Sequence, residues 1–102
     1  MEEQFTPPSH LSPRSKALWA AYVPAKAKTL GRLALVQTAL ESLDRADAAR
    51  AAVDADGMTT VTKTTGAVHV HPLLKVEREQ RQLFVKLWGQ LGFHCDRMAG
   101  DR

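Results

Sequence analysis

Two histidines and a histidine–cysteine pair are the residues that could bind a metal ion or act as nucleophile and base. His69 and His71 are two positions apart, which places both on one face of an extended strand, and His94 directly precedes Cys95. Imidazole nitrogen and thiolate sulfur are ligands that Zn²⁺ prefers. The spacing matches no established zinc motif, however, and adjacent residues rarely bind one ion. A zinc-dependent hydrolase using His69, His71 and Cys95 therefore stands only as a distant third hypothesis.

Other catalytic arrangements have no better support. No glycine-rich loop surrounds Cys95, and no acidic residue is placed to orient a histidine base beside it. The sequence also lacks the glycine-rich phosphate-binding motif of ATPases. We therefore predict a protein that is not an enzyme, with no catalytic residue, no metal site and no cofactor. His71 is better explained as a cap for the helix that follows it.

Basic side chains are the chemical signal that remains. The formal net charge of +3 permits contact with nucleic acid without requiring it. The group that we predict to bind nucleic acid consists of Arg14, Lys16, Lys26, Lys28 and Arg32. A solvated basic face is the alternative, and it is the commoner explanation. A second set consists of Lys63, Lys75, Arg78, Arg81 and Lys86, and we interpret it as ordinary surface because Glu77 and Glu79 are interleaved with it.

The first part of the chain predicts an arm and one short helix. Residues 1–10 contain two adjacent prolines, which lack backbone donors, so we expect a flexible or extended arm there. Ser12 is placed to cap a helix with Pro13 in its first position, and Pro24 should end that helix.

A long second helix is predicted next. Thr29 is a candidate cap, the helix continues to Asp56, and Gly57 should end it. A helix of about 27 residues is roughly 40 Å long, more than so small a domain can enclose. We therefore expect it to protrude or to pack against a neighbour. Its apolar stripe is Leu33, Val36, Leu40 and Leu43, followed by alanines.

A β-hairpin and a third helix complete the prediction. Residues 58–71 alternate in polarity and are rich in threonine and valine, with Gly66 at the turn. The third helix covers residues 71–92, with Pro72 in its first position and Gly92 at its end. Its apolar stripe is broad in the second half, where Leu83, Leu87 and Trp88 lie, and Gln80 interrupts it.

These elements predict a mainly α fold with a small β-hairpin. A short N-terminal helix precedes two long antiparallel helices, which the hairpin joins, in one domain over residues 11–93 with a tail at 94–102. One copy of 102 residues cannot cover both apolar stripes, so we expect an oligomer, and head-to-tail contacts between identical copies would make it a ring if the rotation closes. The predicted interface consists of Leu33, Val36, Leu40, Leu43, Leu83, Leu87 and Trp88.

The order of these elements resembles that of a known family. The segment PPSHLSPRSKALW, the passage ending in HPLLKVE and the closing QLG step are similar to short small subunits of tailed-phage terminases. The resemblance covers residues 7–93. The tail FHCDRMAGDR departs from the pattern, because it lacks the proline and serine step that often follows the LG pair.

The resemblance implies a non-catalytic packaging factor of a phage, prophage or satellite. It implies a homo-oligomeric ring that holds double-stranded viral DNA at the packaging start site and regulates the ATPase and nuclease of the terminase large subunit. An HNH endonuclease is a further partner that the resemblance suggests. The second hypothesis is a protein-interaction adaptor of the same fold that joins another terminase component without contacting DNA.

The expected location is the host cytoplasm, without a membrane. The single Cys95 cannot form an internal disulfide, which fits a reducing compartment. No apolar run approaches the roughly 20 residues that a membrane-spanning helix needs. The acidic, proline-bearing start MEEQFTPPSH does not resemble a signal peptide.

Overall fold

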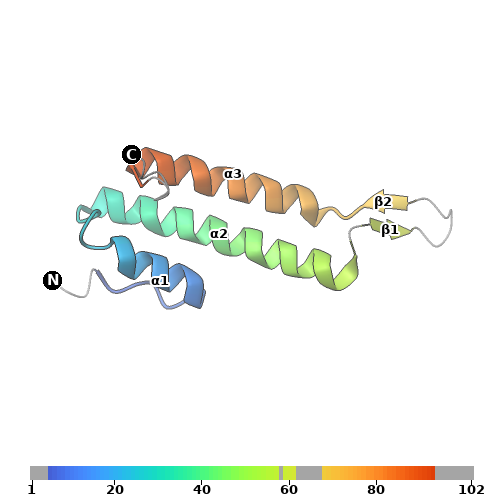
Figure 1. The fold of residues 1–102 in the computed structure, drawn as a ribbon, viewed down its shortest axis with the longest axis horizontal. Helices are drawn as coiled ribbons and strands as arrows, with labels where there is room; N and C mark the ends of the chain where they lie inside the picture. The colour runs from blue at the N-terminus through green and yellow to red at the C-terminus, as the bar shows by residue number, and fades with distance from the viewer. Residues whose placement is uncertain (1–4, 58, 62–67, 94–102) are drawn as a thin grey trace, which may run out of the picture.

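Two long helices lie side by side and antiparallel, and the short N-terminal helix lies beside the first of them, on the side away from the other (Figure 1). The computed structural model describes residues 5–57, 59–61 and 68–93. The elements follow in the order α1 (Pro13–Tyr22), α2 (Leu30–Asp56), β1 (Thr59–Val61), β2 (Val68–Val70) and α3 (Leu73–Leu91). The prediction of a mainly α fold with a short helix and two long antiparallel helices is confirmed.

Local capping sets the ends of these helices. The Ser12 hydroxyl accepts a hydrogen bond from the Ser15 N–H at 3.1 Å, and the Thr29 hydroxyl accepts one from the Arg32 N–H at 3.2 Å. Gly57 and Gly92 follow α2 and α3 with φ of 90° and 82°, where a side chain would be strained. The predicted caps and terminators are therefore confirmed. The third helix begins at Leu73, after Pro72 rather than with it.

The strands lie at the end of the molecule away from α1 (Figure 1). β1 and β2 pair antiparallel, with Thr59 opposite Val70 and Val61 opposite Val68. Both strands fall inside the segment 58–71 where a hairpin is predicted. Residue 58 and residues 62–67, which include the predicted turn at Gly66, lie outside the described residues.

The apolar core is concentrated where all three helices meet, which we call the proximal end. Its buried residues are Leu11, Trp19, Val23, Ala27, Leu33, Val36, Leu40, Leu43, Leu91 and Phe93. Tyr22 stacks on Phe93 at 4.5 Å between ring centroids, and Trp88 meets both rings edge-on. Further along α2 the buried residues are small, namely Ala46, Ala49 and Val53, and they allow α3 to approach closely.

The predicted interface between copies is wrong for the four residues of α2. Leu33, Val36, Leu40 and Leu43 are between 0% and 7% exposed within a single copy. They are buried because they belong to the cluster that α1 and the last turn of α3 complete. Of the three predicted residues on α3, Leu83 is 37% exposed, while Leu87 and Trp88 are partly buried.

Residues 5–10, within the segment predicted as a flexible or extended arm, lie against the helices. Phe5 packs against the core, and its carbonyl accepts a hydrogen bond of 2.7 Å from the indole N–H of Trp19. A buried indole needs such an acceptor, so Trp19 holds this segment against α1. The predicted tail at 94–102 lies outside the described residues.

The burial of the α2 stripe generates a test. Leu40→Ala should lower the free energy of unfolding by about 2–5 kcal/mol, because it leaves a cavity in the core of one copy. Leu83→Ala is the matched control and should cost clearly less, since Leu83 is 37% exposed. Urea unfolding at two protein concentrations measures both. An effect of Leu40→Ala that shrinks at low protein concentration would return Leu40 to an interface between copies.

Candidate functional site: the carboxylate row of α2 and its basic partners

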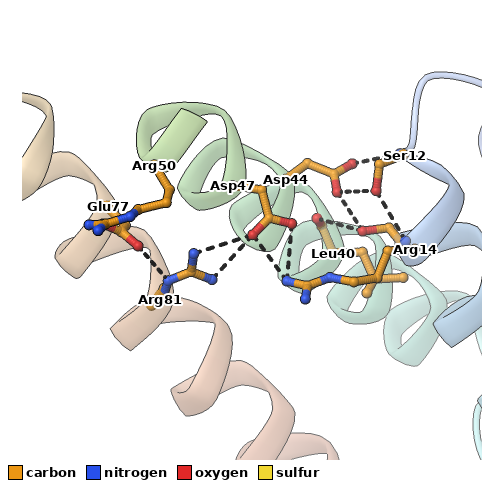
Figure 2. A network of polar contacts seen from close by, with 9 residues as sticks. Ser12, Arg14, Leu40, Asp44, Asp47, Arg50, Glu77 and Arg81 are labelled. Atoms are coloured by element: carbon orange, nitrogen blue, oxygen red, sulfur yellow. Dashed lines mark hydrogen bonds and ion pairs between the residues drawn. The ribbon is translucent and has the colours of Figure 1, made fainter. Parts of the chain in front are cut away.

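Three carboxylates on α2 form the polar centre of the molecule. Glu41, Asp44 and Asp47 are three residues apart, a spacing that keeps neighbouring side chains on adjacent parts of the helix surface. We call them the carboxylate row. Figure 2 shows Asp44 turned toward Ser12 on the side of α1, and Asp47 between Arg14 and Arg81. The row thus faces both other helices.

Asp44 fixes the beginning of α1. Its carboxylate accepts hydrogen bonds from the Ser12 N–H at 2.9 Å, the Ser12 hydroxyl at 2.7 Å and the Ser15 hydroxyl at 2.6 Å. Ser15 is fully buried. Burial alone would raise the pKa of Asp44, but the hydrogen bonds from Ser15 and Ser12 outweigh it, and the pKa lies below its ordinary value of 3.8. The ionised carboxylate is therefore the form that holds α1.

Asp47 connects α1 and α3 through two arginines. Arg14 of α1 and Arg81 of α3 reach its carboxylate at 3.0 Å and 3.3 Å. Arg81 also pairs with Glu77 at 3.0 Å, and Glu77 pairs with Arg50 of α2 at 3.3 Å. Burial acts to raise the pKa of Glu77, but the hydrogen bonds from Arg81 and Arg50 outweigh it, so this pKa is lowered. Alternating charges thus link the three helices (Figure 2).

Glu41 completes the row near the N-terminal segment. Its carboxylate contacts His10 Nε2 at 2.8 Å and accepts a hydrogen bond from the Gln37 amide at 3.0 Å. The hydrogen bonds from Gln37 and then His10 lower the pKa of Glu41 below its ordinary value of 4.5. Both ends of the segment that precedes α1 are therefore attached, at Trp19 through Phe5 and at Glu41 through His10.

Two of the five residues predicted to bind DNA have structural roles. Arg14 pairs with Asp47, and Arg32 donates hydrogen bonds to the carbonyls of Lys26 and Leu91 at 3.1 Å and 2.6 Å. The Arg32 guanidinium also lies over the Phe93 ring at 5.6 Å. Arg32 therefore ties the start of α2 to the end of α3.

The other three predicted residues differ in position. Lys26 and Lys28 are exposed in the connection between α1 and α2 at the proximal end, and Lys16 is half-buried on α1. The five residues therefore do not form one free basic surface. Lys26 and Lys28 are the pair that remains accessible to a ligand.

His71 lies where α2 and α3 come together at the strand end. It is 6% exposed, its Nε2 is 3.1 Å from the Asp56 carboxylate, and its Nδ1 accepts a hydrogen bond from the Leu73 N–H at 3.1 Å. The prediction that His71 caps α3 is confirmed. Among the described residues no three histidine, cysteine or acidic side chains come together as a metal site. Cys95 lies outside them.

Gln80 of α3 is half-buried, and its Oε1 atom is shielded from water. Its Oε1 has no hydrogen-bond partner within the described part of the chain. The sequence analysis placed this residue in the apolar stripe, and the structure shows the consequence: a polar atom shielded from water at an energetic cost.

The attachment of α1 through Asp44 was not predicted from the sequence. The signal was available in part, since Ser12 and Ser15 are three residues apart on α1 and the carboxylate row repeats every three residues on α2. The sequence does not say which of these faces meet. That pairing depends on where α1 docks.

Comparisons with known proteins do not add a relative. No protein-family model matches this chain, and no curated protein or solved structure is significantly similar to it. Among the described helices, none has the length and apolar character needed to cross a membrane.

The lowered pKa of Asp44 predicts a pH dependence. Because the folded-state pKa lies below the unfolded-state value, the stabilisation is complete well above pH 3.8 and is lost as the pH falls through the folded-state pKa. Asp44→Asn should lower the free energy of unfolding by about 1–3 kcal/mol at pH 7. The difference from the unchanged protein should shrink near pH 3.

Urea unfolding at pH 7 and near pH 3 measures this difference. Asp54→Asn is the matched control, because the Asp54 side chain is 63% exposed and pairs only with Arg50 among the described residues. An equal loss for Asp44→Asn at both pH values would show that the charge on Asp44 does not hold α1.

Proposed function

We propose that this chain is a non-catalytic, DNA-contacting subunit of the terminase small-subunit type. In this role it holds double-stranded viral DNA at the packaging start site and regulates the ATPase and nuclease of a terminase large subunit. One observation carries the DNA contact: no acidic residue lies between Phe5 and Leu40, while that stretch supplies five cations. Lys26 and Lys28 project from its exposed part, at the proximal end.

The distribution of charge along the molecule supports this role. The second half of α2 is acidic, and its Asp47 pairs with Arg14 of α1 and Arg81 of α3. The exposed lysines of the proximal end are at the opposite end of α2 from Asp54 and Asp56. A polyanion would therefore be attracted to the exposed lysines of the proximal end more than to the surface of α2 around Asp54 and Asp56. Contact through lysine alone would be mostly with phosphates, which carry no sequence information.

Self-association belongs to the same proposal. Val76 and Leu83 of α3 are both 37% exposed, and they lie seven residues apart on one edge of the helix. A second copy covering this edge would bury apolar surface that one copy leaves in water. A ring, with the segment 58–71 as a complete hairpin, is the form of assembly that the family resemblance implies.

A protein-interaction adaptor is the second candidate. The observation that favours it is the internal use of Arg14 and Arg32, since both are bound to groups of this chain. An adaptor would use the same fold to join another terminase component, and its exposed lysines would be solvated surface.

A salt series separates the two functions. Binding of phage-end DNA by the full chain should weaken as salt rises, with a slope of about 0.9 in log–log terms for each phosphate contact. Lys26→Gln with Lys28→Gln should reduce that slope by about 1.8. Arg45→Gln, an exposed change on the acidic helix, is the control and should leave it unaltered.

The result that contradicts the DNA-contacting role is equally clear. If the full chain shows no salt-dependent binding at low salt, the adaptor is the better account. Light scattering on the same samples gives the mass of the assembly, and a monomer at micromolar concentration would contradict the self-association.

A further inference from the structure

The charged residues of α3 lie on two different sides of the helix, one facing α2 and one facing outward. Glu77 points toward α2, where it pairs with Arg50, and it also pairs with Arg81 of its own helix; its side chain is only 15% exposed. Lys75 and Arg78, its close neighbours in sequence, are exposed. Of the two acids interleaved with this basic set, Glu77 is therefore withdrawn from the surface and neutralised, while Glu79 stays exposed.

The outward side of α3 carries a row of polar and basic residues. The row consists of Lys75, Arg78, Gln82 and Lys86, and we call it the outer ridge. These residues are spaced by three, four and four positions, which aligns them along the helix axis over about 16 Å. All four are exposed. Gly89 continues the row without a side chain, and the space beside it is open.

One acidic residue lies near the outer ridge. Glu79 pairs with Lys75 at 3.9 Å, and both side chains are more than half exposed. A pair this long and this exposed is weak, so Lys75 can exchange it for another anion at little cost. Within the described part of the chain, Arg78 and Lys86 form no ion pair. The outer ridge is therefore net positive.

We propose that the outer ridge binds the phosphate backbone of double-stranded DNA. Its cations stand on a helix that α2 already holds in place, so binding requires no ordering of the backbone. Gln82 adds a neutral hydrogen-bond donor in the same row. The inference goes beyond the proposed function, because it assigns a second surface, separate from Lys26 and Lys28.

A membrane surface is the less favoured ligand. A helix that binds in a membrane interface must turn its apolar face to the lipid. The apolar face of α3 packs against α2 and the proximal core, and Val85 is the large apolar residue that stands 66% exposed beside the outer ridge. The geometry therefore favours contact with phosphates through charge over insertion into lipid.

The test measures binding of the full chain to a labelled DNA duplex of about 20 base pairs between 50 and 200 mM salt, the range over which phosphate contacts are strongly weakened. Arg78→Gln with Lys86→Gln should reduce the log–log salt slope by about 1.8. Arg45→Gln is the matched control for Arg78→Gln, since both are exposed arginines on long helices. Circular dichroism should show unchanged helix content, because neither residue of the ridge variant packs in the core.

The outcomes separate this inference from the proposed function. A reduced slope in the ridge variant, with the control unchanged, supports the outer ridge. A slope reduced only by Lys26→Gln with Lys28→Gln overturns the ridge and leaves the proposed function standing. An equal loss in Arg45→Gln overturns the ridge as a general charge effect. Salt-independent binding by the unchanged protein and by every variant overturns both the outer ridge and the proposed function. Binding to acidic phospholipid vesicles is measured alongside. If the ridge variant loses binding to the vesicles and keeps binding to DNA, the ridge is a membrane surface and is overturned as a DNA surface.

Discussion

The start of α1 is held on the helical pair by the carboxylate of Asp44. Asp44 accepts three hydrogen bonds from Ser12 and Ser15, the residues that begin α1. A helix of 10 residues is too short to be stable alone in water, so it needs tertiary contacts to form. Trp19 and Val23 supply the apolar part of those contacts. Asp44 fixes where the first turn of α1 lies on α2. Without a fixed first turn, the apolar residues of α1 would have no single position on α2.

The two sides of α2 are built differently. Toward α3 the seam is long, and small residues such as Ala46 and Ala49 let the helices approach closely. Toward α1 the contact is short and mixes apolar with charged groups. Asp47 joins both sides, because Arg14 and Arg81 reach the same carboxylate. The consequence for function is that the acidic half of α2 pairs with arginines of its neighbours. Within the described residues, the proximal end and the outer side of α3 keep exposed cations for a ligand.

Helix ends, which depend on neighbouring residues, could be predicted from the sequence. The packing between helices that are far apart in the chain could not. Ser12, Thr29 and Gly92 act on residues within one turn of themselves, so their roles follow from the sequence. The stripe of α2 was correctly seen as apolar, but its partner was taken to be another copy. The residues that bury this stripe belong to α1 and to the end of α3, and the latter are far from it in the sequence.

The basic residues show the same division. Arg32 was predicted to contact DNA because of its charge, but its guanidinium N–H groups donate hydrogen bonds to the carbonyls of Lys26 and Leu91. The sequence prediction also placed Glu77 beside Lys75 on one surface, whereas helix geometry turns them to different sides. Sequence proximity is therefore a poor guide to which charges a ligand meets, and the periodicity of the helix is a better one.

The most direct test of this account is a double-mutant cycle between Ser15 and Asp44, two groups joined at 2.6 Å. Ser15→Ala and Asp44→Asn are compared singly and together by urea unfolding at pH 7. If the carboxylate holds the start of α1, the coupling free energy should be about 1–3 kcal/mol. A coupling within about 0.3 kcal/mol of zero would mean that the two changes act independently, and the attachment of α1 would then have to rest on its apolar contacts and on the ion pair between Arg14 and Asp47.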